Sequence, residues 1–368
     1  MTFPATPVKV VLVDDSVVIR RVLHDLLSAE PEIEVVATAS NGKLGLDKIR
    51  ATRPDIVILD IEMPVMDGLA TLAQLRQEFP RLPVLMFSTL TTRGGAATLD
   101  ALALGATDCL TKPETLGGRA HAIESIRAEI VPKIKVLGRV SSTRPRPASP
   151  IRASVPARAS RPGGAGRVDV VAVAISTGGP RALQDIVPHV PAQLPVPMVV
   201  VQHMPPVFTA LLAERLDRAA AVHVVEAEDG MPLEAGTLYI APGGRHLVVR
   251  PSPRGVVAEL NDDAPENSCR PSADPLFRSV ARTYGAHTLG VVLTGMGSDG
   301  CKGADAIVRA GGEVITQDEQ SSVVWGMPGA VVQHGLAAAV VPLERVVDEI
   351  ITRTACGRAA LHSVGARR

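Results

Sequence analysis

Residues 59–68 read LDIEMPVMDG, and the apolar run Asp55–Leu59 stops at Asp60, inside that stretch. A short apolar run that ends in a turn containing Pro and Gly predicts a buried strand of a parallel sheet. Similar runs flank it along the first half of the chain: Val8–Val13, Ile33–Thr38, Pro83–Phe87 and Asp108–Thr111. Helical patterns follow them, for example over Val17–Ser28 and Gly68–Gln77. The alternation predicts a doubly wound α/β domain of five strands and five helices, with helices on both faces of its sheet.

Polar side chains follow the strands of this predicted sheet. Asp14 and Asp15 end the first run, Asp60 ends the third, and Ser88 and Lys112 follow the fourth and fifth. Because the carboxyl ends of parallel strands meet at one edge, we expect these side chains to lie together. Three carboxylates repel one another unless a cation lies between them, and hard oxygen ligands suit Mg²⁺. The joint pattern predicts a phosphoryl-accepting site, although any single aspartate would be interpreted as a solvated loop residue.

These motifs, DDS (14–16), LDIEMPVMDG (59–68), FST (87–89) and TKP (111–113), make residues 8–132 similar to response-regulator receiver domains. The resemblance implies that Asp60 is phosphorylated by a histidine kinase. It implies that Asp14, Asp15, Asp60 and the carbonyl of Glu62 bind Mg²⁺.

The resemblance also implies that Ser88 and Lys112 sense the phosphoryl group. One position departs from the family pattern, because Cys109 stands where receiver domains usually carry Tyr or Phe. We therefore expect the signal to leave this domain without the usual aromatic latch.

The segment Ser141–Arg167 separates the two halves of the chain. It reads SSTRPRPASPIRASVPARASRPGGAGR, with six Arg, five Pro and five Ser and no acidic residue. It has neither helical nor strand periodicity, which predicts a semi-extended linker. Contact of its positive charge with an acidic partner is the alternative.

Buried strand patterns return after this segment, over Val168–Ile175, Pro197–Val201 and Thr288–Leu293. Shorter strand signals lie between them, split by Pro and Gly turns: Thr237–Ile240, Leu247–Arg250 and Val256–Leu260. The second half is therefore predicted to be a doubly wound parallel-sheet α/β domain with an antiparallel hairpin insert.

Three motifs of this half each place a polar residue just after a strand. AISTGGP (174–180) contains Ser176, VQHMPP (201–206) contains His203, and LTGMGSDG (293–300) contains Asp299. A serine nucleophile needs a base, and the base needs a group that fixes its tautomer, so the three types suit a Ser-His-Asp arrangement. Backbone N–H groups after Ser176 or around Met296 could bind an oxyanion.

Each motif also has a simpler interpretation. AISTGGP alone could be a phosphate-binding turn or a helix cap, His203 a structural histidine, and Asp299 a helix cap. The order Ser, His, Asp and the presence of Ala174 instead of the first glycine of GxSxG exclude the α/β-hydrolase superfamily. What favours catalysis is that all three residues lie in turns after strands.

The same motifs, with YIAPGGRHL (239–247), RPSADPLF (270–277) and QDEQSSVVWGMPGA (317–330), make residues 168–355 similar to the chemotaxis protein-glutamate methylesterases, the CheB family. The departures are apolar: Ile175 where many members have Ala, and Trp325 where Phe or Tyr is common. The resemblance implies a receiver domain at 1–132, a linker at 133–167, a methylesterase domain at 168–356 and a tail at 357–368.

The resemblance implies that Ser176 is the nucleophile, His203 the base, Asp299 the orienting acid and the Met296 N–H the oxyanion donor. Thr177 and Arg270 are implied to contact the substrate, a glutamyl methyl ester or glutamine of a methyl-accepting chemotaxis receptor. The hydrolase would need no cofactor. Phosphorylation of Asp60 would relieve occlusion of the catalytic residues by the receiver, with activation by the receiver as the alternative.

The composition of the chain argues against several other classes of function. Lys plus Arg and Asp plus Glu both number 38, and aromatic residues make up 2%. Neutral net charge, few stacking side chains and no basic helix-turn-helix argue against nucleic acid as a partner.

No apolar run approaches the about 20 residues that span a bilayer, so no membrane insertion is expected. Four scattered cysteines and the lack of a signal-peptide pattern predict a cytoplasmic protein. A DNA-binding output and a non-catalytic phosphate-binding module are the alternatives from other classes.

Overall fold

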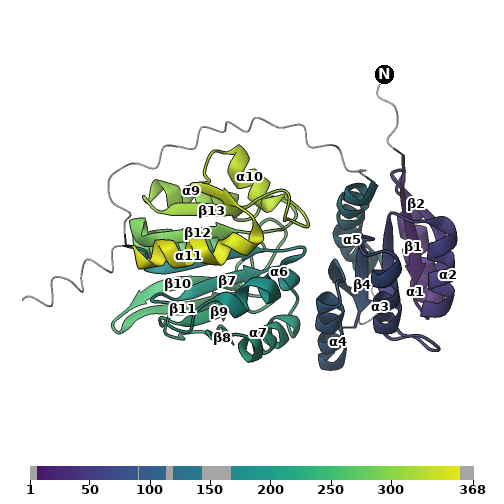
Figure 1. Ribbon diagram of the computed structural model, residues 1–368, viewed down its shortest axis with the longest axis horizontal. Helices are drawn as coiled ribbons and strands as arrows, with labels where there is room; N and C mark the ends of the chain where they lie inside the picture. The colour runs from purple at the N-terminus through teal and green to yellow at the C-terminus, as the bar shows by residue number, and fades with distance from the viewer. Residues whose placement is uncertain (1–5, 90, 113–118, 143–166, 357–368) are drawn as a thin grey trace, which may run out of the picture. The chain divides into compact units, whose positions relative to one another are not determined.

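The computed structural model describes residues 6–89, 91–112, 119–142 and 167–356. These residues form two compact units, one on each side of residues 143–166 (Figure 1).

The first unit is built on a five-stranded parallel sheet in the order β2-β1-β3-β4-β5. Its strands are β1 (Val8–Val13), β2 (Ile33–Ala39), β3 (Ile56–Asp60), β4 (Val84–Ser88) and β5 (Asp108–Thr111). Its helices are α1 (Val17–Ser28), α2 (Gly42–Thr52), α3 (Gly68–Glu78), α4 (Thr92–Ala103) and α5 (Arg119–Ser142). Helix α1 packs beside α5, and α2, α3 and α4 pack in a separate row. Every residue of β3 and β4 is buried, as expected for strands covered on both faces.

Local capping chemistry fixes where the first four helices begin. Ser16, Asn41, Asp67 and Thr91 each accept a hydrogen bond from a backbone N–H of the first helical turn. Side-chain acceptors at this position satisfy N–H groups that have no partner inside the helix. The turns after the strands therefore have a defined length, which keeps the polar residues of the sheet edge in register.

Helix α5 extends beyond the predicted end of the receiver domain at residue 132. It continues through residues 133–142, which the sequence analysis assigned to the linker. Ile134 and Leu137 of this extension are buried, so packing continues the helix past the predicted domain end at residue 132. The rest of the predicted linker, residues 143–166, and the predicted tail, 357–368, lie outside the described residues.

The second unit contains a seven-stranded parallel sheet in the order β14-β13-β12-β6-β7-β9-β8. Its strands are β6 (Val170–Ile175), β7 (Met198–Gln202), β8 (His223–Glu226), β9 (Thr237–Ile240), β12 (Thr288–Val292), β13 (Glu313–Gln317) and β14 (Ala339–Val341). Its helices are α6 (Gly179–Ile186), α7 (Phe208–Ala219), α8 (Ala273–Tyr284), α9 (Cys301–Arg309), α10 (Met327–Gln333) and α11 (Val346–Ala355). Short 3-10 segments are η2 (Val187–His189), η3 (Gly285–His287) and η4 (Leu343–Arg345).

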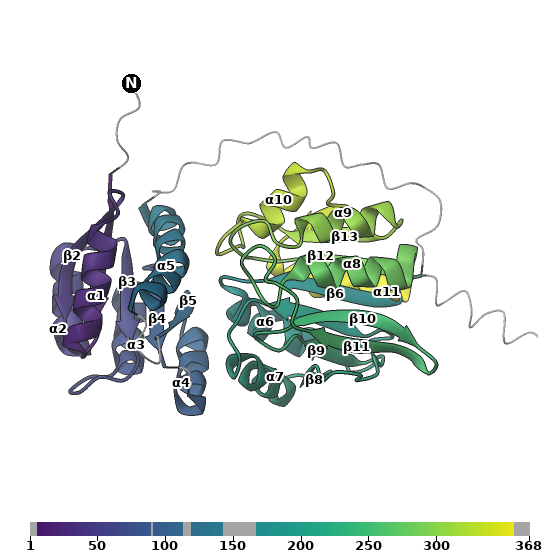
Figure 2. The ribbon, with the colours of Figure 1, turned by 180° about the vertical axis from the view of Figure 1, so that it is seen from behind.

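A separate two-stranded antiparallel sheet joins β10 (His246–Ser252) and β11 (Gly255–Asn261). This is the predicted hairpin insert, and it packs against α8 (Figure 2). Strand β9 was predicted among the same short strands, but it pairs in parallel with β7 and β8 in the main sheet. The sequence did not reveal that β9 belongs to the main sheet. A four-residue strand carries too short an apolar run to show that it is covered by strands on both sides.

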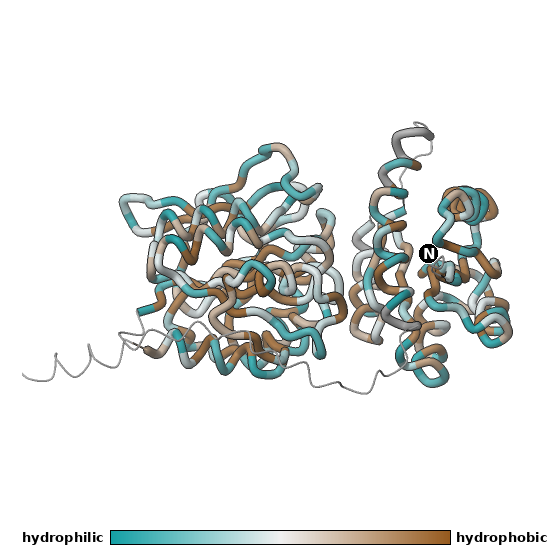
Figure 3. The backbone as a smooth tube through the Cα atoms, turned by 90° about the horizontal axis from the view of Figure 1, so that it is seen from above, coloured by the Kyte–Doolittle hydropathy of each residue, from teal (hydrophilic) through white to brown (hydrophobic). Residues whose placement is uncertain are grey.

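Alternate residues of β6 build the two cores of this unit. Val170, Ala172 and Ala174 belong to a cluster with α8, α9 and the hairpin. Val173 lines a small apolar cavity with residues of α6 and α11 on the opposite face. The strand is therefore central, and the hydrophobic segments gather inside the unit while the polar segments lie outside (Figure 3). Of the helices in the described ranges, none combines the length and apolar character that crossing a membrane requires.

Candidate functional site

The first unit brings the predicted acidic residues together at the carboxyl edge of its sheet. Ligand atoms of Asp14, Asp15 and Asp60 lie within 4.8 Å of one another. The Lys112 Nζ lies 2.9 Å from Asp14 Oδ2 and 2.7 Å from Asp60 Oδ2. Asp14 and Asp15 follow β1, Asp60 ends β3 and Lys112 follows β5, so the carboxyl edge of this sheet gathers them as expected.

The electrostatics of this cluster centre on Asp60. Burial raises its pKa to about 6, with further upward contributions from Asp14 and Asp15, while Lys112 opposes the shift. Three carboxylates share one ammonium here, so the cluster keeps an excess of negative charge that a divalent cation would offset. Three carboxylates with closely spaced oxygens therefore fit the predicted Mg²⁺ site.

The predicted phosphoryl-sensing serine is tied to the start of α4. The Ser88 hydroxyl donates to the Gly94 carbonyl at 3.2 Å. Cys109, at the position of the usual aromatic, is buried, and burial raises the pKa of its thiol. The Cys109 carbonyl accepts from Lys133 Nζ at 3.2 Å, and Lys133 also pairs with Asp108 at 3.0 Å. Strand β5 is thus linked to α5 by a lysine rather than by an aromatic latch.

In the second unit, adjacent strands position Ser176 and His203. Ile175 of β6 pairs with Gln202 of β7, and the two site residues follow directly. The Gln202 Nε2 donates to the carbonyls of both Ser176 and His203 at 3.1 Å. Gln202 therefore links the backbones of Ser176 and His203. This residue lies in the quoted motif VQHMPP, but no role was predicted for it.

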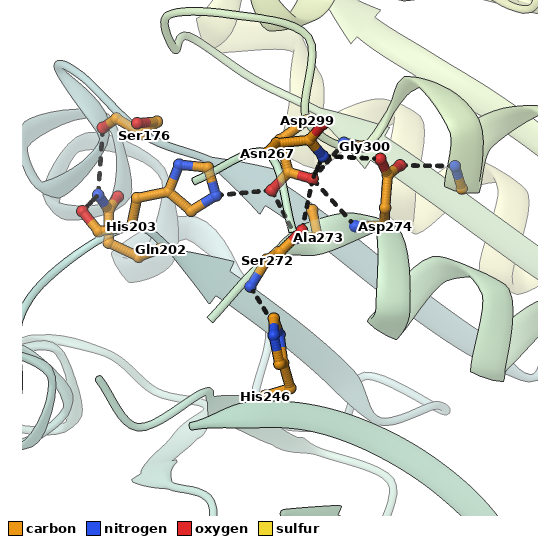
Figure 4. Close-up of polar contacts among 11 residues, drawn as sticks. Ser176, Gln202, His203, His246, Asn267, Ser272, Ala273, Asp274, Asp299 and Gly300 are labelled. Atoms are coloured by element: carbon orange, nitrogen blue, oxygen red, sulfur yellow. Dashed lines mark hydrogen bonds and ion pairs between the residues drawn. The ribbon is translucent and has the colours of Figure 1, made fainter. Parts of the chain in front are cut away.

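His203 and Asp299 form the polar core of this site (Figure 4). The His203 Nε2 lies 2.7 Å from Asp299 Oδ2. The ring lies between Ser176 and Asp299, Nδ1 is the nitrogen that does not bond to Asp299, and the Cys269 side chain also contacts the ring. Within the described part of the chain, no hydrogen bond joins the Ser176 hydroxyl to the ring. Such contacts are often long in free enzymes and shorten when substrate binds.

Asp299 is buried where two helices begin. Helix α8 starts at Ala273 and α9 starts at Cys301, directly after the loop that carries Asp299. The carboxylate accepts hydrogen bonds from His203, Asn267, Ser272, Ala273, Asp274 and Gly300. Backbone N–H groups at helix starts favour negative charge, so these helices stabilise the ionised carboxylate.

The pKa shifts of the pair follow from these contacts. Burial opposes the charge of Asp299, but hydrogen bonds from His203, Ala273 and Ser272 hold its pKa below the ordinary range. Burial lowers the pKa of His203, but the hydrogen bond to Asp299 and the neighbouring Cys269 outweigh it and raise it to about 9. The pair therefore favours an imidazolium, the form that a base takes after accepting the serine proton.

The loop that carries the predicted oxyanion donor, Met296, passes next to the serine. A Cβ on residue 295 would lie 2.8 Å from the Ser176 Cβ, so the backbone before Met296 passes against the serine. In the described ranges no hydrogen bond engages the Met296 N–H. A backbone donor that is free beside a nucleophile is the group an oxyanion requires.

The two predicted substrate contacts have partners within the protein. Thr177 is buried, and its carbonyl accepts from the Thr294 hydroxyl at 2.9 Å. The Arg270 guanidinium donates to the carbonyls of Asp262 and Asp263 at 3.0 and 3.2 Å. These contacts order the loops around the site, and a direct role toward substrate stays a prediction.

Two protein families match successive parts of the chain. The CheB methylesterase family model matches residues 171–350, and the response regulator receiver domain model matches residues 10–124. A protein-glutamate methylesterase/protein-glutamine glutaminase from Trichodesmium erythraeum is 46% identical over 347 residues, covering 94% of this chain and 98% of its own length. One from a Nocardioides species is 48% identical over 364 residues, covering 98% of this chain and 99% of its own length. The chain belongs to the CheB family.

A solved structure agrees with this membership. The Thermotoga maritima CheB methylesterase catalytic domain is 42% identical, with a TM-score of 0.50, and the match covers 51% of this chain and 99% of that chain. The predicted family, its enzyme class and the α/β fold class are thereby confirmed. The two alternatives from other classes, a DNA-binding output and a non-catalytic phosphate-binding module, are not the class that this family membership indicates.

The sequence analysis quoted two further contributors without giving them a role. Ser272 and Asp274 lie within RPSADPLF, and both contact Asp299. The available signal was a serine followed two residues later by an aspartate at a helix start, the pattern Ser-Ala-Asp.

We expect the His203 imidazole of the full-length chain to titrate above about 6.5, the ordinary histidine value. Replacing the acid, Asp299→Asn, should lower this pKa because the charge that favours the imidazolium is removed. Ring-proton NMR against pH measures both values. Asp305→Asn, on the exposed side of α9, is the control. Titration of wild-type His203 at or below 6.5, or no change in the Asn variant, would contradict these electrostatics.

Proposed function

We propose that this CheB chain hydrolyses γ-glutamyl methyl esters of chemotaxis receptors through Ser176, His203 and Asp299. Deamidation of specific receptor glutamines would use the same residues. The observation that carries the proposal is the Asp299–His203 contact of 2.7 Å beside Ser176. A phosphate-binding turn at AISTGGP would have no use for this pair.

The chemistry follows the Ser-His-Asp template. His203 removes the Ser176 proton while the hydroxyl oxygen attacks the ester carbonyl, and the Met296 N–H faces the resulting oxyanion. The bond to the methoxy group then breaks, and methanol leaves with the proton from His203. Water, deprotonated by the same ring, cleaves the acyl-serine and leaves a glutamate carboxylate. With a glutamine substrate the leaving group is ammonia.

Asp299 has two roles in this sequence. Its Oδ2 holds the ring so that Nδ1 remains available to the serine. Its charge stabilises the imidazolium that forms in each half of the reaction.

We further propose that phosphorylation of Asp60 controls the esterase. A carboxylate oxygen of Asp60 would attack the phosphohistidine of a histidine kinase, breaking the P–N bond and forming an aspartyl phosphate. Asp14, Asp15, Asp60 and the Glu62 carbonyl would hold Mg²⁺, which supplies positive charge for the transferred group. Lys112 and Ser88 would bind the phosphoryl oxygens, and Ser88 would then give up its contact with Gly94.

Ser176→Ala should abolish methanol release from receptors that carry labelled glutamyl methyl esters, because the nucleophile is lost. The expected loss is on the order of 10⁴-fold or more. Volatile label released per minute is the measurement, and Ser252→Ala in the β10–β11 hairpin is the matched control. Release by the Ser176 variant at the wild-type rate would end the triad assignment.

Asp60→Asn should remove the response of the esterase to a small-molecule phosphodonor with Mg²⁺, while the wild type is activated. Methanol release with and without phosphodonor is the measurement. Asp55→Asn, at the start of the same strand region, is the matched control and should respond like the wild type.

Occlusion and activation by the receiver give different results with a chain that starts near Gly166. Under occlusion, this chain releases methanol without phosphodonor. If the truncated chain is inactive toward the methyl ester but an organophosphonate still labels its Ser176, the occlusion model is wrong and the receiver instead activates the esterase.

A further inference from the structure

Two buried carboxylates lie side by side behind His203. Asp274 is 0% exposed and Asp299 is 2% exposed. Each caps the helix of the other: the Ala273 N–H of α8 donates to Asp299 at 2.6 Å, and the Gly303 N–H of α9 donates to Asp274 at 2.6 Å. Burial raises the pKa of Asp274, and the charge of Asp299 adds to the shift. Two like charges this close need a donor between them.

Asn267 supplies that donor. Its Nδ2 lies 2.9 Å from Asp274 Oδ2 and 2.8 Å from Asp299 Oδ1. One amide nitrogen carries two hydrogens, so both carboxylates are satisfied at once. Figure 4 shows Asn267 between the two acids.

The local turn explains the residue type but not this contact. Glu266 and Cys269 exchange backbone hydrogen bonds of 3.2 and 2.9 Å, which closes a two-residue turn. Asn267 and Ser268 have φ of 53° and 61°, the left-handed values of a type I′ turn, where Asn is favoured. Glu266 anchors the turn to α8 through a bidentate pair with Arg278. Glycine would suit the turn equally well, so the amide side chain needs another reason.

We propose that Asn267 is a positioning residue for the Asp299–His203 pair, an inference that rests on the proposed function. Its Nδ2 is one of four donors to Asp299 Oδ1, with Ser272, Asp274 and Gly300, and it also donates to Asp274 Oδ2. The other oxygen, Oδ2, receives His203 Nε2. Asn267 also lets Asp274 stay beside Asp299 without a proton. By holding Asp299, Asn267 helps to fix the orientation of the His203 ring and so the nitrogen that this ring presents to Ser176.

The test uses variants of the full-length chain in the methanol-release assay. Asn267→Gly keeps the turn and removes both donors, and Ser268→Gly is its matched control in the same turn. We expect a kcat about 10- to 100-fold lower for Asn267→Gly with KM unchanged, because a small displacement of catalytic groups costs rates of this order. Ser268→Gly should retain the wild-type kcat. Circular dichroism and thermal melting check that both variants are folded.

A second pair of variants tests the electrostatic effect of position 267 on His203. Asn267→Asp keeps the size of the side chain and the left-handed backbone, but its charge adds to Asp274 and Asp299 and favours the imidazolium. The rising limb of kcat/KM against pH, and the His203 titration measured by NMR, should both move to higher pH than in Ser268→Asp, which carries the same charge one residue away. A purely structural role would move neither.

Three results would overturn the proposal: a kcat for Asn267→Gly within twofold of Ser268→Gly, a change confined to KM, or equal His203 titrations in the two Asp variants. Failure of the proposed function has a different signature. In that case the wild type and Ser176→Ala release methanol equally, while the NMR titration still decides the role of Asn267.

Discussion

The buried carboxylate of Asp299 is the constraint on which the catalytic unit depends. Burial alone would drive such a group to its neutral form, and a neutral acid could not support a charged histidine. The chain prevents this by starting two helices, α8 and α9, at the same carboxylate. The helices must therefore approach closely, and they do so at Gly303, where a Cβ would lie 2.4 Å from the Phe277 Cβ. The close packing of α8 and α9 and the orientation of His203 therefore both follow from the need to stabilise the charge of Asp299.

Both units place their chemistry at the carboxyl edge of a doubly wound sheet, but they compensate negative charge differently. In the first unit a lysine side chain, Lys112, bridges Asp14 and Asp60, and the closely spaced oxygens of three aspartates fit a metal ion. In the second unit fixed backbone N–H groups surround Asp299. The first arrangement suits a group that changes charge state during signalling, and the second suits an acid that keeps one orientation throughout a reaction.

The sequence predicted most of this because strand ends and turns are local signals. Asp60, Ser176 and His203 could be placed because each follows a strongly apolar run. The extension of α5 could not, because its packing against the sheet depends on residues distant in the sequence. Strand β9 was predicted, but its partners were not, because a four-residue run does not identify the strands it pairs with. The role of Asn267 was hidden because a turn residue and a hydrogen-bond donor have the same sequence signature.

The central claim is that Asp299 holds His203 by Nε2 so that Nδ1 serves Ser176. The most direct test is a crystal structure of the full-length chain after reaction with an organophosphonate, which reproduces a tetrahedral intermediate. The account predicts phosphorus bonded to Ser176 Oγ, a phosphonyl oxygen on the Met296 N–H, and His203 Nε2 still on Asp299. Phosphorus on another residue, or a histidine ring that has turned its Nδ1 to Asp299, would contradict it.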